Sequence, residues 1–117
     1  DPTLLDVAGE NANGLIYSYP FDATSHNSEI RNFVNSFKER YKIEPEAYSA
    51  EAYEGFKLTM MAFAGCGKNY DCIKKYLSGL KGYKSVFGSL SFDENGDVYY
   101  EFFLKTIKNG QFVPYEK

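Results

Sequence analysis

Residues 86–107, VFGSLSFDENGDVYYEFFLKTI, decide the fold class, because here the spacing of apolar residues changes from a helical period to a period of two. Residues 86–92 alternate between large apolar and small side chains, which predicts a strand. The polar segment 93–97, DENGD, predicts a turn, and residues 98–107 form the longest strand candidate of the chain. This part of the chain is therefore predicted to consist of strands joined by tight turns.

Two more strands are predicted near the ends of the chain. Residues 108–111, KNGQ, predict a second hairpin, because Asn-Gly readily takes the positive φ angles of a type I′ turn. The segment FVPY, residues 112–115, predicts the final strand. Near the other end, GLIYSYP, residues 14–20, predicts a buried strand that Pro20 stops. We therefore expect about four strands in all.

Between these strands, the apolar spacing predicts three helices. The first has a stripe at i, i+3, i+4, i+7 and i+11, and Ser25, Asn27 or Ser28 is expected to cap it. The second runs from about Ser49 to Ala64, and the third covers residues 70–80. The stripe of the first helix is Ile30, Phe33, Val34, Phe37 and Tyr41, and the second helix has Ala52, Tyr53, Phe56, Met60 and Phe63 on one side. The order of elements predicts a mixed α/β fold.

The composition describes one globular domain and excludes several classes of partner. The 117 residues are 44% hydrophobic, which is enough for one sizeable core. Sixteen acidic and thirteen basic residues give a net charge of −3, so neither nucleic acid nor an anionic membrane is expected. The longest largely apolar run, Leu58 to Cys66, is too short to span a bilayer. Because the chain begins at Asp1 and not at Met, we expect a piece of a longer or processed protein.

The only two cysteines, Cys66 and Cys72, stand in the segment CGKNYDC between the second and third predicted helices. A metal site needs about four ligands, and the chain adds only His26 to these two thiols. The five intervening residues do not form a C-x₂-C redox motif, and His26 lies in a polar loop, where a solvated side chain is expected. A disulfide or two free buried thiols remain, and we favour the disulfide. It would join the two helix ends and predicts a periplasmic or extracellular protein.

Catalytic and metal-binding motifs are not found. The segment DENGD places Gly96 at position 4 and Leu104 at position 12 of a would-be calcium loop, where Gly at 6 and Glu at 12 are required, so a hairpin turn is expected. The glycines around Cys66 follow a helix and lack the Lys-Ser or Lys-Thr pair of a phosphate loop. No G-x-S-x-G elbow occurs. We therefore predict no enzyme, no metal site and no cofactor.

Several segments form a combination that is typical of one protein family. The most specific are Ala-Tyr-x-Ala-x-Ala-Tyr (residues 47–53), G-x-L-x-F-D-x-x-G-D (88–97) and K-x-G-x-F-V (108–113). With ANGLIYSYPF, FKERY and CGKNYDCIKKYL, the chain from about Ala8 to its end resembles the C-terminal third of a type I periplasmic binding protein. The branched-chain amino-acid-binding (Leu/Ile/Val) proteins of ABC importers are the nearest relatives that the resemblance suggests. Several members of that family also carry a cysteine pair at this helix junction.

The resemblance implies a fragment of a two-lobed, doubly wound α/β clamp that closes on a small ligand. In that arrangement, residues 1–46 belong to lobe two, as a strand and a helix. Residues 47–96 supply helices and a strand to lobe one, and residues 97–117 return across the hinge as the last strands. The whole chain is then one incomplete domain.

The resemblance also suggests three ligand-binding residues. Tyr53 matches a position near the start of a cleft-facing helix, where family members place a contact with the ligand. A helix N-terminus has unpaired N–H groups and the positive end of the helix dipole, which suit a ligand carboxylate. Glu51 and Tyr19 are weaker candidates that are suggested by position alone.

The resemblance implies the solute-binding component of an ABC importer for an amino acid or a similar small polar solute. Its partner would be a membrane permease, and a membrane anchor on the full-length protein is compatible with this role. Two alternatives stay open, the ectodomain of a sensor receptor and a stand-alone α+β interaction module. The first two-thirds of the family's fold are missing, so the chain alone is not expected to bind a ligand tightly. Its helices would then leave apolar faces exposed, and we expect a dimer or a swapped assembly.

Overall fold

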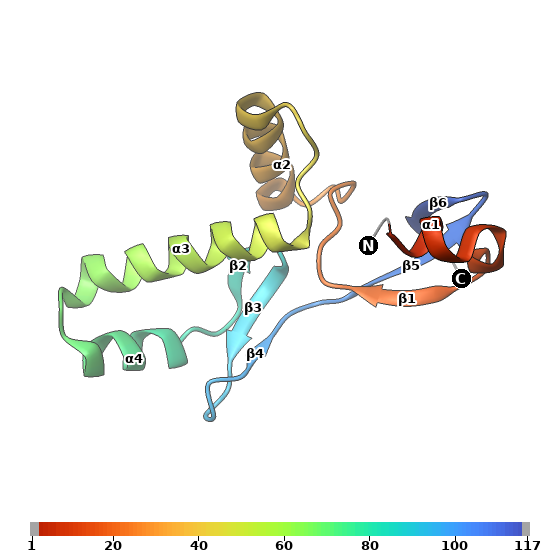
Figure 1. The fold of residues 1–117 in the computed structure, drawn as a ribbon. Helices are drawn as coiled ribbons and strands as arrows, with labels where there is room; N and C mark the ends of the chain where they lie inside the picture. Colours follow the sequence, from red (N-terminus) through yellow and green to blue (C-terminus); the bar gives the residue numbers. More distant parts are fainter. Residues whose placement is uncertain (1–2, 116–117) are drawn as a thin grey trace. The chain divides into compact units, whose positions relative to one another are not determined.

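The computed structural model describes residues 3–115, and it has the mixed α/β character that the sequence predicts (Figure 1). Its elements in chain order are α1 (Thr3–Ala8), the 3₁₀ helix η1 (Gly9–Ala12), β1 (Ile16–Tyr19), α2 (Ser28–Tyr41), α3 (Ala47–Cys66), α4 (Tyr70–Ser78), β2 (Tyr83–Ser85), β3 (Gly88–Phe92), β4 (Val98–Tyr99), β5 (Phe103–Lys108) and β6 (Gln111–Pro114).

The chain divides into two compact units. The first consists of residues 1–19 and 102–117, and its described part holds α1, η1 and the antiparallel sheet β1-β5-β6. The second consists of residues 20–101 and holds α2, α3, α4 and the antiparallel sheet β2-β3-β4. This division does not test the predicted assignment of residues to two lobes of a larger protein, which stays a prediction.

In the first unit, β5 is the central strand, because both β1 and β6 pair with it. The ladder with β1 runs from Ile16 opposite Thr106 to Tyr19 opposite Phe103. The hairpin between β5 and β6 turns at Asn109 and Gly110, with φ angles of 51° and 70°. Both angles are positive, so the Asn-Gly hairpin that the sequence predicts is confirmed.

In the second unit, α2 begins where the polar segment before it predicts. The Asn27 side-chain oxygen accepts a hydrogen bond of 2.8 Å from the N–H of Glu29, so Asn27 is the cap among the three candidates. The predicted apolar stripe is buried in its first half, at Ile30, Phe33 and Val34. Its last residue, Tyr41, is 60% exposed, so the stripe does not face a core along its whole length.

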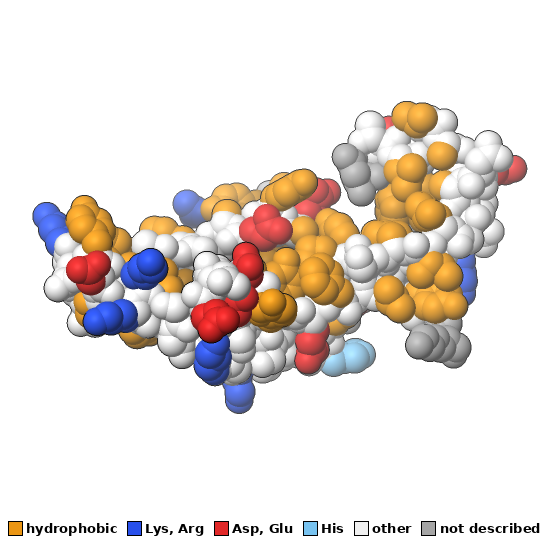
Figure 2. Space-filling model, turned by 90° about the horizontal axis from the view of Figure 1, so that it is seen from below, with side chains coloured by type: hydrophobic (Ala, Val, Ile, Leu, Met, Phe, Trp, Pro, Cys, Tyr) orange, Lys and Arg blue, Asp and Glu red, His pale blue; other side chains and the backbone are white. Residues whose placement is uncertain are grey.

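The second predicted helix is longer than expected, because α3 begins at Ala47 and ends at Cys66. Its buried face consists of small residues, Leu58 and one carboxylate, namely Ala47, Ala50, Glu54, Leu58 and Ala62. The bulky residues on the other side are largely exposed: Tyr53 44%, Phe56 69%, Met60 52% and Phe63 40%. Hydrophobic side chains reach the surface in several places on the face that Figure 2 shows.

The predicted disulfide is confirmed. Cys66 at the end of α3 and Cys72 in the first turn of α4 are joined, with Cα atoms 5.5 Å apart. The Asn69 side chain accepts a hydrogen bond of 3.0 Å from the N–H of Cys72 and caps α4. The disulfide and this cap together fix the sharp turn between the two antiparallel helices, which Figure 1 shows in green.

Three predictions about the strands and the chain start are wrong in detail. Residues 98–107 are not one strand: they form β4 and β5, which belong to different sheets and different units, with a break at residues 100–102. Val86 and Phe87 lie in the turn between β2 and β3 instead of in a strand. Residues 3–12 are helical, where only a polar lead was expected. The described residues therefore hold one more α-helix and two more strands than predicted.

Candidate functional site

The three residues that the sequence suggests for ligand binding belong to different units. Tyr53 and Glu51 lie on α3 in the second unit, and Tyr19 ends β1 in the first unit. Each is therefore described within its own unit, and their roles in ligand binding stay predictions.

Tyr53 is held on one side and open on the other. Its ring lies 4.8 Å from the ring of the buried Phe33, and the Lys57 Nζ lies 5.9 Å from its centroid. The helix begins at Ala47, so Tyr53 stands in the second turn. The unpaired N–H groups of a helix are those of its first turn, so Tyr53 stands one turn after them. Glu51 is exposed on the same helix.

Tyr19 belongs to an aromatic row on one side of the sheet in the first unit. Its ring lies 6.1 Å from Tyr17 in an edge-to-face arrangement, and Tyr17 has the same relation to Phe112. Lys105 Nζ lies 5.2 Å from the Tyr19 centroid, within the range of a cation–π interaction. Partial burial, with a smaller effect of Tyr19, raises the pKa of the Tyr17 phenol. This side of the sheet therefore offers neutral aromatic surface beside one cation.

Lys57 is the centre of a charged and aromatic cluster on α3. Its Nζ lies 3.8 Å from Oε1 of Glu54 and 3.9 Å from Oε2 of Glu29, and it lies 5.4 Å from the centroid of Tyr83. Partial burial alone would lower the pKa of Lys57, but the contact with Tyr83 and the charge of Glu54 outweigh it and raise the pKa. Burial, opposed by Lys57, raises the pKa of the Tyr83 phenol. Lys57 therefore stays charged and attracts both carboxylates beside it.

Glu54 is the residue of this cluster that the sequence analysis missed. Its side chain is only 2% exposed, and its Oε2 accepts a hydrogen bond of 2.9 Å from the N–H of Val86. The signal was present in the spacing, because Glu54 lies four residues after Ala50 and four before Leu58 on the face of small apolar residues. An acidic residue in register with a buried stripe indicates a specific internal partner.

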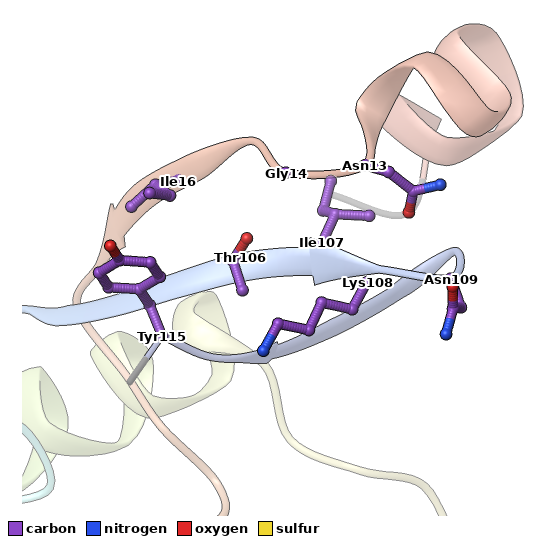
Figure 3. A pocket seen from close by; sticks show the side chains of 8 residues that line it. All are labelled: Asn13, Gly14, Ile16, Thr106, Ile107, Lys108, Asn109 and Tyr115. Atoms are coloured by element: carbon purple, nitrogen blue, oxygen red, sulfur yellow. The ribbon is translucent and has the colours of Figure 1, made fainter. Parts of the chain in front are cut away.

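Two hollows on the described surface do not contain the predicted ligand residues. One in the first unit has a volume of about 490 Å³, and Figure 3 shows that its lining comes from the coil before β1 and the first residue of β1, from β5 and its turn, and from the residue after β6. Among residues 3–115, Lys108 is the one charged residue in its lining. Another, of about 540 Å³, lies beside the disulfide. Neither is lined by Tyr53, Glu51 or Tyr19, so no complete ligand site is formed by either hollow.

The DENGD segment forms a turn, as the sequence predicts. Oδ1 of Asp93 accepts hydrogen bonds from the N–H groups of Asn95 and Asp97, at 2.9 and 2.8 Å. Desolvation would raise the pKa of Asp93, but these N–H groups outweigh it and lower the pKa. Within residues 3–115 there is no group of three or more His, Cys, Asp or Glu side chains that could hold a metal ion. No helix in that range has the length and apolar character needed to cross a membrane.

Known proteins are similar to this chain in structure more than in sequence. No protein-family model matches it, and no curated protein sequence is similar to it. Among solved structures, the leucine-binding protein LivK of Thermotoga maritima superposes with a TM-score of 0.83 and 25% identity, over 98% of this chain and 33% of that one. An ABC transporter substrate-binding protein of Desulfitobacterium hafniense gives a TM-score of 0.83 and 27% identity, over 92% of this chain and 33% of its own.

A third structure is the substrate-binding protein LivJ of a branched-chain amino-acid transporter from Streptococcus pneumoniae, solved with isoleucine. It has a TM-score of 0.80 and 25% identity, over 96% of this chain and 32% of that one. The chain thus spans about a third of the length of each of these structures. All three are solute-binding proteins, and none is described as an enzyme.

Proposed function

We propose that this chain, which has the fold of about one third of a branched-chain amino-acid-binding protein of the type I periplasmic class, is part of the solute-binding component of an ABC importer. The ligand would be an amino acid or a similar small polar solute, and the partner a membrane permease. The observation that supports the proposal is the superposition over 98% of the chain with a leucine-binding protein. A binding protein of this kind acts outside the cytoplasm and is not an enzyme, and the disulfide between Cys66 and Cys72 fits that compartment.

The ligand site in this proposal needs both lobes of a clamp. Residues 1–46 would belong to lobe two, residues 47–96 to lobe one, and residues 97–117 would return across the hinge as the last strands. Tyr53 would contact the ligand with the open side of its ring, and Glu51 and Tyr19 would be further contacts. Tyrosine suits this role, because it combines apolar area with a polar tip. The chain by itself would bind the ligand weakly, because the remaining two-thirds of the clamp supply most of the contacts.

The exposed side of α3 supports a second part of the proposal, that the isolated chain associates with itself. Tyr53, Phe56, Met60 and Phe63 form a bulky apolar face that is 40 to 69% exposed. Contiguous apolar surface of this kind usually marks an interface. Analytical ultracentrifugation would show a dimer that Phe56→Glu converts to a monomer. A monomer of the unaltered chain at about 100 μM would contradict this part alone, since weak interfaces persist at that concentration.

The function itself is tested by transplanting the chain. Residues 3–115 would replace the equivalent third of the Thermotoga maritima leucine-binding protein, and calorimetry would measure leucine binding by the chimera. We expect binding, which Tyr53→Ala weakens about tenfold or more through loss of a buried aromatic contact. Tyr70→Ala, a matched change at a residue that is 81% exposed, should leave binding unaltered. A folded chimera that binds none of the twenty amino acids would contradict the proposal.

A further inference from the structure

The chain connects its two units at two places, and at each place consecutive residues belong to different units. One lies between Tyr19 and Pro20 and the other between Glu101 and Phe102. On the side of the first unit the two passages are held together by the sheet, because Tyr19 pairs with Phe103. On the side of the second unit β4 ends at Tyr99, and no strand continues across the boundary.

The turn between β2 and β3 has an unusual composition for a hairpin. Its two residues, Val86 and Phe87, carry none of the turn-forming side chains, and they are only 1% and 4% exposed. A hairpin turn normally faces water, because its backbone N–H groups need partners. A buried apolar turn therefore indicates that Val86 and Phe87 serve as an internal contact.

Glu54 and Ser85 supply the partners that such a turn needs. Glu54 Oε2 accepts from the N–H of Val86, and Ser85 Oγ accepts from the N–H of Phe87 at 3.0 Å. Ser85 is completely buried, and its hydroxyl donates back to the carbonyl of Gly88. A carboxylate acceptor forms a stronger hydrogen bond than a neutral one, and Lys57 neutralises its charge. The turn is thus fixed to α3 through a buried side chain.

The ring of Phe87 touches both segments that lead out of the second unit. It lies 6.4 Å from the ring of Phe21, which follows the first passage, and 5.1 Å from the ring of Tyr100, which precedes the second. Phe21 is 2% exposed and packs also against Phe33 of α2, at 5.9 Å. Phe87 is therefore the side chain at which the two segments meet within this unit.

We propose that Phe87, positioned by the carboxylate of Glu54, anchors both connecting segments where they enter the second unit. The inference goes beyond the proposed function and needs no ligand, because every contact that carries it lies within the second unit. Glu54 acts through Phe87 and is a positioning residue.

Amide hydrogen exchange, followed by NMR in the absence of any ligand, tests the anchor. Phe87→Leu should speed exchange about tenfold in residues 21–25 and 98–101, since the smaller side chain loosens both segments. Exchange in α4 and in β5 should stay unchanged. Tyr70→Leu is the control, because it likewise replaces an aromatic ring by leucine at a side chain that is 81% exposed. Glu54→Ala should reproduce the effect of Phe87→Leu, and Glu54→Gln should restore slow exchange, because its amide oxygen still accepts from Val86.

Two outcomes would overturn the proposal. Unchanged exchange in both segments would show that Phe87 does not hold them. A uniform rise that includes α4 would show that Phe87 is an ordinary core residue, and a normal far-UV spectrum would separate this result from unfolding. If Glu54→Gln behaves like Glu54→Ala, the role of Glu54 as an acceptor for Val86 is refuted. Because the measurement involves no ligand, its failure is distinguishable from a failure of the chimera to bind leucine.

Discussion

The disulfide between Cys66 and Cys72 closes a small loop, and its removal has a calculable effect. The two cysteines are 6 residues apart in sequence, so the chain-entropy relation gives about 2 kcal/mol of stabilisation at 25 °C. The stabilisation comes from the unfolded chain, which the closed loop restricts. For a unit of this size, that free energy corresponds to a melting temperature about 10 °C higher. We therefore expect the variant Cys66→Ser/Cys72→Ser to melt about 10 °C below the unaltered chain.

The assay is thermal unfolding followed by circular dichroism, with and without a reducing agent. Reduction should lower the melting temperature of the unaltered chain to that of the double variant. The double variant itself should not respond to the reducing agent, which controls for effects of the reagent on the rest of the protein. A melting temperature that falls by less than about 2 °C in both cases would refute the reasoning, because the loop would then contribute almost nothing.

Three further outcomes are expected. Leu58→Ala should lower the free energy of unfolding by about 2–5 kcal/mol in urea titrations, because Leu58 is 6% exposed, whereas Tyr70→Ala, at a side chain that is 81% exposed, should cost less than about 0.5 kcal/mol. Asn27→Ala should cost about 1 kcal/mol in the same titrations, through loss of the α2 cap, and an unchanged value would contradict the cap. NMR titration should give the Asp93 carboxyl a pKa below its ordinary value of 3.8. The ionised carboxylate then stabilises the turn fully above pH 3.8, and this stabilisation is lost as the pH falls through the pKa of the folded state.

The sequence places the candidate ligand-binding residues on the correct helix and strand. It does not reveal which side chains lie beside them. The spacing of residues 47–64 correctly predicts a helix that carries Tyr53 and Glu51. It does not reveal that Glu54 is buried against Val86, because that hydrogen bond joins residues 32 positions apart. The Tyr53–Phe33 contact likewise joins two helices that the sequence places without relating them.

Local patterns determined α2, α3, α4, the Asn-Gly hairpin and the disulfide, because each depends on residues close together in the sequence. Only the tertiary structure decided which face of α3 is covered. That helix has a small apolar stripe and a bulky one, and periodicity marks both equally. Only the tertiary structure shows that residues 98–107 are divided between two sheets. β5 pairs with β1, which lies some 90 residues earlier in the chain, whereas β4 belongs to the other sheet. Long-range pairing of this kind leaves no mark in a local pattern.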